Sequence, residues 1–333
     1  MRGTVLVGDV GGTNTRFALA SRTNGRIELR HAAAWMTVLH PDLPTAIRTY
    51  LAQAGNPDLA GAAMCAAGPV LGEGGDAHVL LTNCAWDVSV STIADATGVG
   101  SPLLLNDFSA IAWSIPALSP DDTVQIGPGR ARPGQPIGVL GAGTGLGVAT
   151  LVPVDDDFIV LPGEGGHVDL AATSPREISL IYQLMQEYGH VSAERVLSGP
   201  GLEALYMAIG AIDGASGDTM AKGRPAALDI ANRARAGTCP ISVEAVHLFC
   251  GWLGAFAGNL ALTIGAGGGI YVAGGIVPGW GDLFEAAYFR HRFEAKGRFK
   301  AYLENIPTFV VRRDNPALLG LAHAAARHQR QIG

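Results

Sequence analysis

Residues 4–20, TVLVGDVGGTNTRFALA, predict a β-hairpin whose turn is rich in glycine and hydroxyl groups. The apolar runs 4–7 and 17–20 on either side have the composition of strands. Because glycine has no Cβ and tolerates positive φ, the backbone of such a turn can approach a ligand closely. We therefore expect a binding element here, although a plain tight hairpin is also compatible with this stretch alone.

A second stretch follows the same plan. Residues 137–151, IGVLGAGTGLGVATL, again show a strand, a Gly/Thr turn and a strand. The repetition indicates a partial internal repeat and two related lobes, each with one turn able to cradle phosphate. The length of the chain also favours two domains, since 333 residues are more than a single hydrophobic core usually accommodates. A ligand cleft between the domains is then expected.

The rest of the chain alternates between strand and helix patterns, which is typical of an α/β protein. The first lobe is expected to contain a helix at 43–54 and strands at 62–66, 79–82 and 102–105. Helical spacing then dominates at 175–188, 201–212, 225–236 and 243–264. The chain returns to alternation with strands at 270–273 and 308–311 and helices at 283–290 and 316–327.

Composition excludes several classes of protein. With 48% hydrophobic and 16% charged residues the chain has ample material for a large core. A net charge of −6, with no block of five like charges, argues against a nucleic-acid partner. The four cysteines, Cys65, Cys84, Cys239 and Cys250, lack metal-ligand spacing and are expected to be small core residues in a reducing compartment.

A membrane location is the less favoured alternative. Residues 248–281 contain no charge, and a span needs about 20 continuous apolar residues. However, GAGGG at 265–269 divides the run, which favours a buried helix followed by a buried strand. Gly8 and Asp9 come before any apolar run long enough for an export signal. We therefore expect a cytoplasmic protein without a membrane partner.

The glycine-rich turns do not match the common nucleotide motifs. The chain has no Gly-x-x-x-x-Gly-Lys-Ser/Thr motif and no protein-kinase catalytic loop. GAGTGLG at 141–147 nearly matches a dinucleotide fingerprint, with Glu164 about 20 residues further on. However, Leu146 stands where the last glycine belongs, and Glu164 lies in a Gly/Pro-rich loop, so a Rossmann dehydrogenase is disfavoured.

Two Gly/Thr hairpins instead suit ATP with Mg²⁺. Backbone N–H groups and the hydroxyls of Thr13 and Thr144 can donate to phosphate oxygens. Asp9 can hold the ion directly or through water. A further glycine-rich segment contains Gly274 and Gly275. With this segment present, it is less economical to interpret the two turns as unrelated tight hairpins.

Short polar side chains supply a candidate substrate site. The apolar run 102–105 ends on Asn106 and Asp107, and ligands of open α/β sheets gather at the carboxyl ends of strands. Alternatively, Asp107 is a turn former or the N-cap of a helix that begins near Ser109. On this stretch alone the second interpretation has the advantage.

A second polar group lies in LPGEGGH, residues 161–167, where Glu164 and His167 stand among glycines. Glu194 follows in VSAER, residues 191–195, where it could instead belong to a capping box, and His167 could equally be structural. Carboxylates, amides and imidazoles bind hydroxyls well, since each hydroxyl is both donor and acceptor. Together with Asn106 and Asp107 they suit a polyhydroxylated molecule, of which a sugar is the simplest.

Several blocks carry a resemblance over nearly the whole chain: GDVGGTNTR, NDF, GAGTGLGVA, LPGEGGHVD, VSAERVLSGPGL, VAGGIVP, FRHRFEAKGRFK and DNPALLG. The first four resemble the phosphate, catalytic and sugar loops of the bacterial glucokinase family within the hexokinase-actin superfamily, and the other four are also similar to blocks of that family. The zinc-binding cysteine cluster of the related repressor/open-reading-frame/kinase sugar kinases is missing. The resemblance implies an α/β, two-lobed actin-like ATPase (ribonuclease H-like) fold. It places a small α/β domain at 1–117 plus 308–333 and a larger α+β domain at 118–307.

The resemblance also implies the activity, ATP-dependent phosphorylation of glucose at its 6-hydroxyl, which feeds glycolysis. Asp107 would be the general base, with Asn106, Asp107, Glu164, His167 and Glu194 binding the sugar. ATP and Mg²⁺ would be held by the glycine-rich turns, and the protein would be a homodimer. The implied nucleotide-binding residues are Gly8, Asp9, Val10, Gly11, Gly12, Thr13, Gly143, Thr144, Gly145, Gly274 and Gly275.

Three alternatives stay open on the sequence. Cys84-Ala85 and the basic, proline-rich loop 130–136 leave the sugar preference undecided, so a hexose kinase of broader range is possible. An actin-like ATPase without sugar transfer would use the same turns but gives no reason for the GEGGH loop. A sugar-sensing repressor should carry a helix-turn-helix before the first strand, whereas this sequence begins on that strand.

Overall fold

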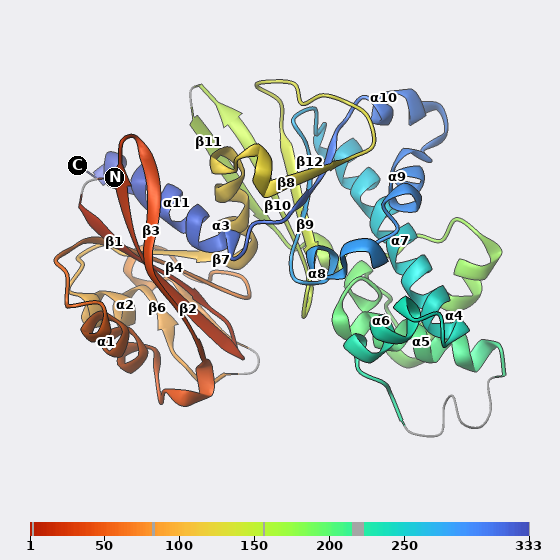
Figure 1. The fold of residues 1–333 in the computed structure, drawn as a ribbon, viewed down its shortest axis with the longest axis horizontal. Helices are drawn as coiled ribbons and strands as arrows, with labels where there is room; N and C mark the ends of the chain where they lie inside the picture. The colour runs from red at the N-terminus through yellow and green to blue at the C-terminus, as the bar shows by residue number, and fades with distance from the viewer. Residues whose placement is uncertain (2, 82–83, 156, 215–222, 333) are drawn as a thin grey trace. The chain divides into compact units, whose positions relative to one another are not determined.

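The computed structural model describes residues 1, 3–81, 84–155, 157–214 and 223–332. The chain forms two units: residues 1–119 with 313–333 make unit 1, and residues 120–312 make unit 2. Each unit is built on one main sheet (Figure 1). The strand at 308–311, which the sequence analysis placed in the smaller domain, belongs to unit 2 because it pairs with two strands of that sheet.

The sheet of unit 1 has the strand order β3-β2-β1-β4-β7. The predicted hairpin is confirmed, because β1 and β2 pair antiparallel and β3 then adds to β2. On the other side, β4 pairs parallel to β1 and β7 parallel to β4. The carboxyl ends of β1, β4 and β7 therefore lie at the same end of the sheet. The strands are β1 (Thr4–Val10), β2 (Asn14–Thr23), β3 (Arg26–Met36), β4 (Leu59–Ala66) and β7 (Leu103–Asn106).

Helices α1 (Leu43–Gln53) and α2 (Val90–Thr97) contact each other, and α3 (Asp107–Ser114) packs on α11 (Pro316–Ile332) (Figure 1). The rings of Phe17, Trp35 and Tyr50 meet in the core that α1 and α2 cover. Of the expected strand at 79–82, the structure has only its first residue in a strand, and residue 82 lies outside the described residues. The shorter elements are η1 (Thr37–Leu39), η2 (Gly74–Asp76), β5 (His78–Val79), β6 (Val88–Ser89) and η3 (Ile115–Ala117).

Unit 2 repeats the topology of unit 1. Its sheet has the order β11-β10-β9-β12-β13-β8, and β9, β10 and β11 pair antiparallel while β12 and β13 run parallel to β9. The first five strands thus correspond to β3-β2-β1-β4-β7, which confirms the internal repeat. The strands are β8 (Thr123–Ile126), β9 (Ile137–Ala142), β10 (Leu146–Val154), β11 (Asp157–Gly163), β12 (Gly269–Ala273) and β13 (Thr308–Val311).

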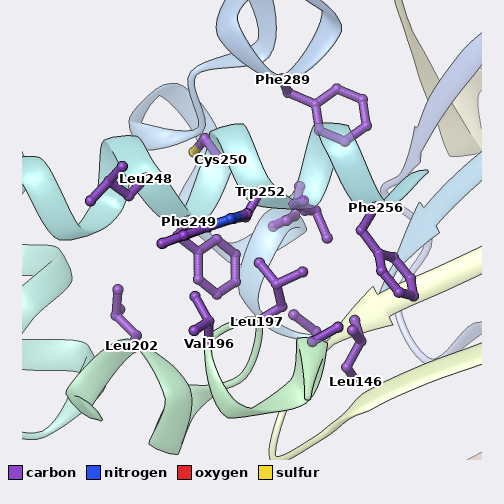
Figure 2. Packing of buried hydrophobic residues seen from close by; sticks show 14 of the residues in the cluster. Leu146, Val196, Leu197, Leu202, Leu248, Phe249, Cys250, Trp252, Phe256 and Phe289 are labelled. Carbon is purple, nitrogen blue, oxygen red and sulfur yellow. The ribbon is translucent and has the colours of Figure 1, made fainter. Parts of the chain in front are cut away.

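Helix α7 (Pro240–Ile264) lies at the centre of the core of unit 2, where Phe249 and Trp252 are buried (Figure 2). It is long and apolar enough to cross a membrane, but 78% of its most apolar window is buried inside the protein. The predicted buried helix followed by a buried strand is therefore confirmed. The other helices are α4 (Pro175–Tyr188), α5 (Gly199–Ile212), α6 (Ala227–Arg235), α8 (Ile276–Trp280), α9 (Ala286–Glu294) and α10 (Lys300–Glu304), with η4 (Pro120–Asp122), η5 (Gly165–His167), η6 (Ala193–Arg195), η7 (Gly281–Leu283) and η8 (Gly297–Phe299).

Capping chemistry explains why α4 has the bounds that the sequence predicts. The hydroxyl of Ser174 accepts a hydrogen bond from the N–H of Glu177 at 3.2 Å, and Pro175 occupies the first turn, where no backbone donor is needed. Gly189, with φ of 69°, ends the helix in a conformation that favours glycine. All four cysteines are free, and Cys65, Cys239 and Cys250 are buried as expected, whereas Cys84 is half-buried.

Gly320 allows α11 to pack closely on α3, the helix that begins at Asp107. A Cβ at this position would collide with the carbonyl oxygen of Ala110. We predict that Gly320→Ala lowers the free energy of unfolding by about 1–3 kcal/mol, although alanine is the better helix former. Urea denaturation measures the change, with Gly100→Ala as control because a Cβ there meets nothing within 4 Å. Equal stability of the two variants would contradict this packing.

Candidate active site

The turn between β1 and β2 is fixed by Thr37 of η1. The Gly11 N–H donates to the carbonyl of Asn14 at 3.0 Å, and the buried Thr37 donates its hydroxyl to the carbonyl of Gly11 at 2.7 Å. The N–H of Thr37 donates to the carbonyl of Thr13 at 2.9 Å. The side chain of Thr13 remains exposed. These hydrogen bonds hold the backbone of the turn, and the exposed Thr13 is left accessible to a ligand.

Asp9 stands on β1 between Arg16 of β2 and Cys65 of β4, its partners in the two strand pairings. Nη1 of Arg16 donates to one carboxylate oxygen at 3.2 Å, and the thiol of Cys65 donates to the other at 3.6 Å. Burial raises the pKa of Asp9 above its ordinary value, while the positive charge of Arg16 acts to lower it. A positive charge beside this carboxylate therefore favours its charged form, and Arg16 supplies one.

Asn106, not Asp107, caps helix α3. Its side-chain oxygen accepts from the N–H groups of Phe108 at 2.9 Å and Ser109 at 3.1 Å, and its amide donates to the carbonyl of Gly68 at 3.0 Å. Asp107 is the first residue of the helix and is half-buried. Its Oδ1 accepts from the N–H of Phe108 at 2.9 Å. The sequence left open that Asp107 was the N-cap, and the structure gives that role to its neighbour.

Cys65 is the residue that sequence reasoning missed in unit 1. Burial raises the pKa of its thiol well above the ordinary value, and the negative charges of Asp9 and Asp107 raise it further. The structure thus brings both carboxylates near one thiol at the carboxyl ends of β1, β4 and β7. The signal that could have identified Cys65 is the strand order, because a cysteine at the end of a strand that pairs parallel to β1 lies beside Asp9.

The second glycine-rich turn, residues 143–145, is hydrogen-bonded to the start of helix α5. The Gly143 N–H donates to the carbonyl of Gly145 at 2.8 Å, and the carbonyl of Gly143 accepts from the N–H of Gly199 at the start of α5, also at 2.8 Å. Gly274, with φ of 83°, packs so closely that a Cβ would stand 2.5 Å from the carbonyl oxygen of Ala142. Thr144 is exposed. The structure therefore brings Gly274 next to Ala142, the residue before this turn.

Unit 2 also brings together the three sugar-binding candidates that it contains. Glu164 and His167 are exposed, and Nε2 of His167 lies 3.9 Å from a carboxylate oxygen of Glu164. The segment of Glu194 runs beside this loop, because the N–H of Ala193 donates to the carbonyl of Val168 at 2.8 Å. Two exposed groups and one half-buried carboxylate thus lie on adjoining segments.

Glu194 does not act in a capping box. Its Oε2 accepts the N–H of Leu146 at 2.8 Å, at the end of the second turn, and η6 has no side-chain cap. A Cβ on Gly145 would stand 2.5 Å from the same oxygen, so a larger residue there would have to displace the carboxylate of Glu194. Among the described residues, no group of three or more His, Cys, Asp or Glu side chains is placed to hold a metal ion.

Comparison with known proteins identifies the family. A family model described as Glucokinase matches residues 6–328. The glucokinase of Cronobacter sakazakii is 45% identical over 326 residues, which cover 98% of this chain and 97% of that protein. The glucokinase of Citrobacter koseri is 46% identical over 315 residues, covering 95% and 94%. The chain belongs to the glucokinase family.

The solved structures agree with this assignment. The crystal structure of a glucokinase from an Antarctic psychrotroph matches with a TM-score of 0.87 and 34% identity, covering 98% of this chain and 100% of that one. This member of the glucokinase family therefore has the actin-like ATPase fold that the resemblance implied. Its internal repeat supplies one glycine-rich turn in each unit.

The ionised Asp9 carboxylate should destabilise the folded chain. Because its pKa is raised by burial, the folded state favours the protonated form, and stability falls as the pH rises through the folded pKa. We predict that Asp9→Asn has a higher free energy of unfolding than the wild type at pH 8, and that the difference shrinks towards pH 4. Urea denaturation across this range measures it.

Asp42→Asn is the control of opposite sign, since hydrogen bonds from Thr45 lower the pKa of Asp42. Loss of this charge should leave the protein no more stable at pH 8 than the wild type. A pH-independent difference between Asp9→Asn and the wild type would show that desolvation of the carboxylate is not its cause.

Proposed function

We propose that the chain transfers the γ-phosphoryl group of ATP to the 6-hydroxyl of glucose, giving ADP and glucose 6-phosphate. The observation that carries this proposal is the match to glucokinases over nearly the full length of the chain. The distribution of polar groups supports it, since each unit offers one glycine-rich turn and one set of short polar side chains. The product would feed glycolysis.

Asp107 is proposed as the general base. A carboxylate in the first turn of α3 is favoured in its ionised form by the helix dipole, and only that form accepts a proton. The hydrogen bond from the N–H of Phe108 fixes the orientation of its Oδ1. The 6-oxygen forms a bond to the γ-phosphorus, the bond from that phosphorus to the β–γ bridging oxygen breaks, and the hydroxyl proton passes to Asp107.

Sugar recognition is assigned to Asn106, Glu164, His167 and Glu194. Each sugar hydroxyl both donates and accepts, and these side chains supply acceptors together with the amide and imidazole donors. A site that hydrogen-bonds every hydroxyl rejects analogues that lack one, because its polar groups are then left unpaired. A set of exposed and half-buried polar side chains can select one hexose in this way.

Backbone N–H groups of the two turns other than those of Gly11 and Gly143, with the hydroxyls of Thr13 and Thr144, would bind the phosphates of ATP, and Gly274 and Gly275 would border the nucleotide. Mg²⁺, held by Asp9 directly or through water, would supply positive charge that neutralises phosphate oxygens. We further propose a cytoplasmic homodimer without nucleic-acid or membrane partners.

Asp107→Asn is expected to lower kcat for glucose by about 100- to 10,000-fold, the usual contribution of a general base. The helix should remain capped, because Asn106 provides that cap. A coupled assay of glucose 6-phosphate formation measures the loss, and Asp95→Asn, an exposed aspartate on α2, is the control. Turnover near the wild-type level would exclude Asp107 as the base.

The substrate itself is tested by assaying the purified chain with glucose, mannose, fructose and no sugar, each with ATP, ADP or polyphosphate as donor. We expect glucose with ATP to give the highest kcat/KM and little ATP hydrolysis without sugar. Similar rates with several hexoses would indicate the broader hexose kinase. Sugar-independent ATP turnover, without phosphorylation of any aldohexose, would favour an actin-like ATPase.

A further inference from the structure

The first glycine-rich turn is held by a residue from outside its hairpin, Thr37 of η1. The hydroxyl of Thr37 donates to the carbonyl of Gly11 at 2.7 Å, and its N–H donates to the carbonyl of Thr13 at 2.9 Å. Thr37 follows Gly11 by 26 positions, and all of β2 and β3 lie between them. One distant residue thus binds two carbonyl groups of the turn.

A second buried hydroxyl, that of Thr15 on β2, determines the direction of these hydrogen bonds. The hydroxyl oxygens of Thr15 and Thr37 lie 2.9 Å apart, and each residue is only 1% exposed. A hydroxyl has one proton, and a carbonyl oxygen can only accept. Because the proton of Thr37 goes to Gly11, Thr15 must be the donor to Thr37. The two hydroxyls therefore form a directed chain that ends on the carbonyl of the turn.

Aromatic residues anchor the segment of Thr37 on both sides. The ring of Trp35 packs on that of Phe17 in the core of unit 1, with 5.9 Å between the ring centroids. After Thr37, the carbonyl of His40 accepts from Nε1 of Trp86 at 3.3 Å. Thr37 therefore binds the turn from a segment that is itself attached to the core.

Peptide geometry converts the two carbonyl contacts into a direction for two N–H groups. In a planar trans peptide group, the C=O of one residue and the N–H of the next point in opposite directions. Because the carbonyls of Gly11 and Thr13 point at Thr37, the N–H groups of Gly12 and Asn14 point away from it. Successive N–H groups directed to one side are the arrangement that binds anions such as phosphate.

We propose that Thr37 is a positioning residue for the proposed nucleotide site. The peptide group between Gly11 and Gly12 has a glycine on each side, so side chains of the turn place little restriction on its orientation. The hydroxyl of Thr37 supplies that restriction and keeps the N–H groups of Gly12 and Asn14 directed at phosphate oxygens. This inference rests on the proposed function, because it requires the phosphates of ATP at the first turn.

The test measures binding rather than turnover. Calorimetry gives the Kd of a non-hydrolysable ATP analogue with Mg²⁺ and, separately, the Kd of glucose. Thr37→Val keeps the shape of the side chain but removes the donor to Gly11. We expect it to bind the analogue about ten-fold more weakly than the wild type, the equivalent of one hydrogen bond, with an unchanged Kd for glucose. Thr37→Ser keeps the hydroxyl and should restore binding of the analogue.

Thr49→Val is the matched control. The hydroxyl of Thr49 donates to the carbonyl of Thr45 at 2.8 Å within α1, so this variant loses the same kind of hydrogen bond in the same unit but outside the turn. It should bind the analogue as the wild type does, and urea denaturation of both valine variants separates a loss of stability from a loss of binding. Thr15→Val should weaken analogue binding less than Thr37→Val, because the bond to Gly11 remains.

Equal affinity of the wild type, Thr37→Val and Thr49→Val for the analogue would overturn the proposal. Equal losses of analogue and glucose affinity in Thr37→Val would also overturn it, since a general loss of structure has that effect. If Thr37→Val does not fold, Thr15→Val decides, and unchanged analogue affinity in that variant would contradict the proposal.

The proposed function is tested separately by wild-type phosphorylation of glucose. If the wild type carries out this reaction and the analogue affinities are equal, only the role of Thr37 is wrong. If the wild type neither binds the analogue nor phosphorylates glucose, the proposed function and this inference are both wrong.

Discussion

Parallel pairing beside a glycine-rich hairpin determines where the polar groups of each unit stand. In unit 1, β4 pairs parallel to β1 and β7 to β4, so Asp9, Cys65 and Asp107 meet at the carboxyl ends of three strands. In unit 2, β12 pairs parallel to β9, which places Gly274 beside the second turn. Helices packed on the sheet faces form the hydrophobic cores, whereas the direction of the strands determines where the polar groups lie.

Asn106 and Asp107 show why adjacent polar residues can divide two tasks. A helix start needs a side chain that accepts backbone N–H groups, and the general base that we propose at Asp107 needs a carboxylate whose charge the surroundings tolerate. Because Asn106 takes the capping bonds, Asp107 keeps a position in the first turn where the helix dipole favours its charge. The sequence could not assign the two roles, since asparagine and aspartate are equally good caps.

Capping residues and turn glycines in the sequence correctly predicted the elements whose ends depend on residues close by in the chain. The residues Ser174, Pro175 and Gly189 define α4 within the chain itself, and each hairpin is encoded by its own glycines. Elements without a clear apolar pattern or with distant partners were missed or misplaced. The sequence did not predict β3, an exposed edge strand that pairs with its neighbour β2. Strand β13 was assigned to the wrong unit because its pairing with β8 joins residues far apart in the sequence. The site candidates were predictable as a set, but their contacts were not, as Glu194 on the N–H of Leu146 shows.

The contact between Glu194 and the second turn also narrows the space at Gly145. Thr144 is exposed and residue 143 has open space for a Cβ, so neither position is restricted by protein atoms on that side. Gly145 is restricted, and the atom in the way is a carboxylate oxygen of Glu194. A larger side chain at this position would have to move the carboxylate of Glu194, which is the flexible end of that side chain. Under the functions that we propose, a residue assigned to the sugar therefore borders the turn assigned to the nucleotide.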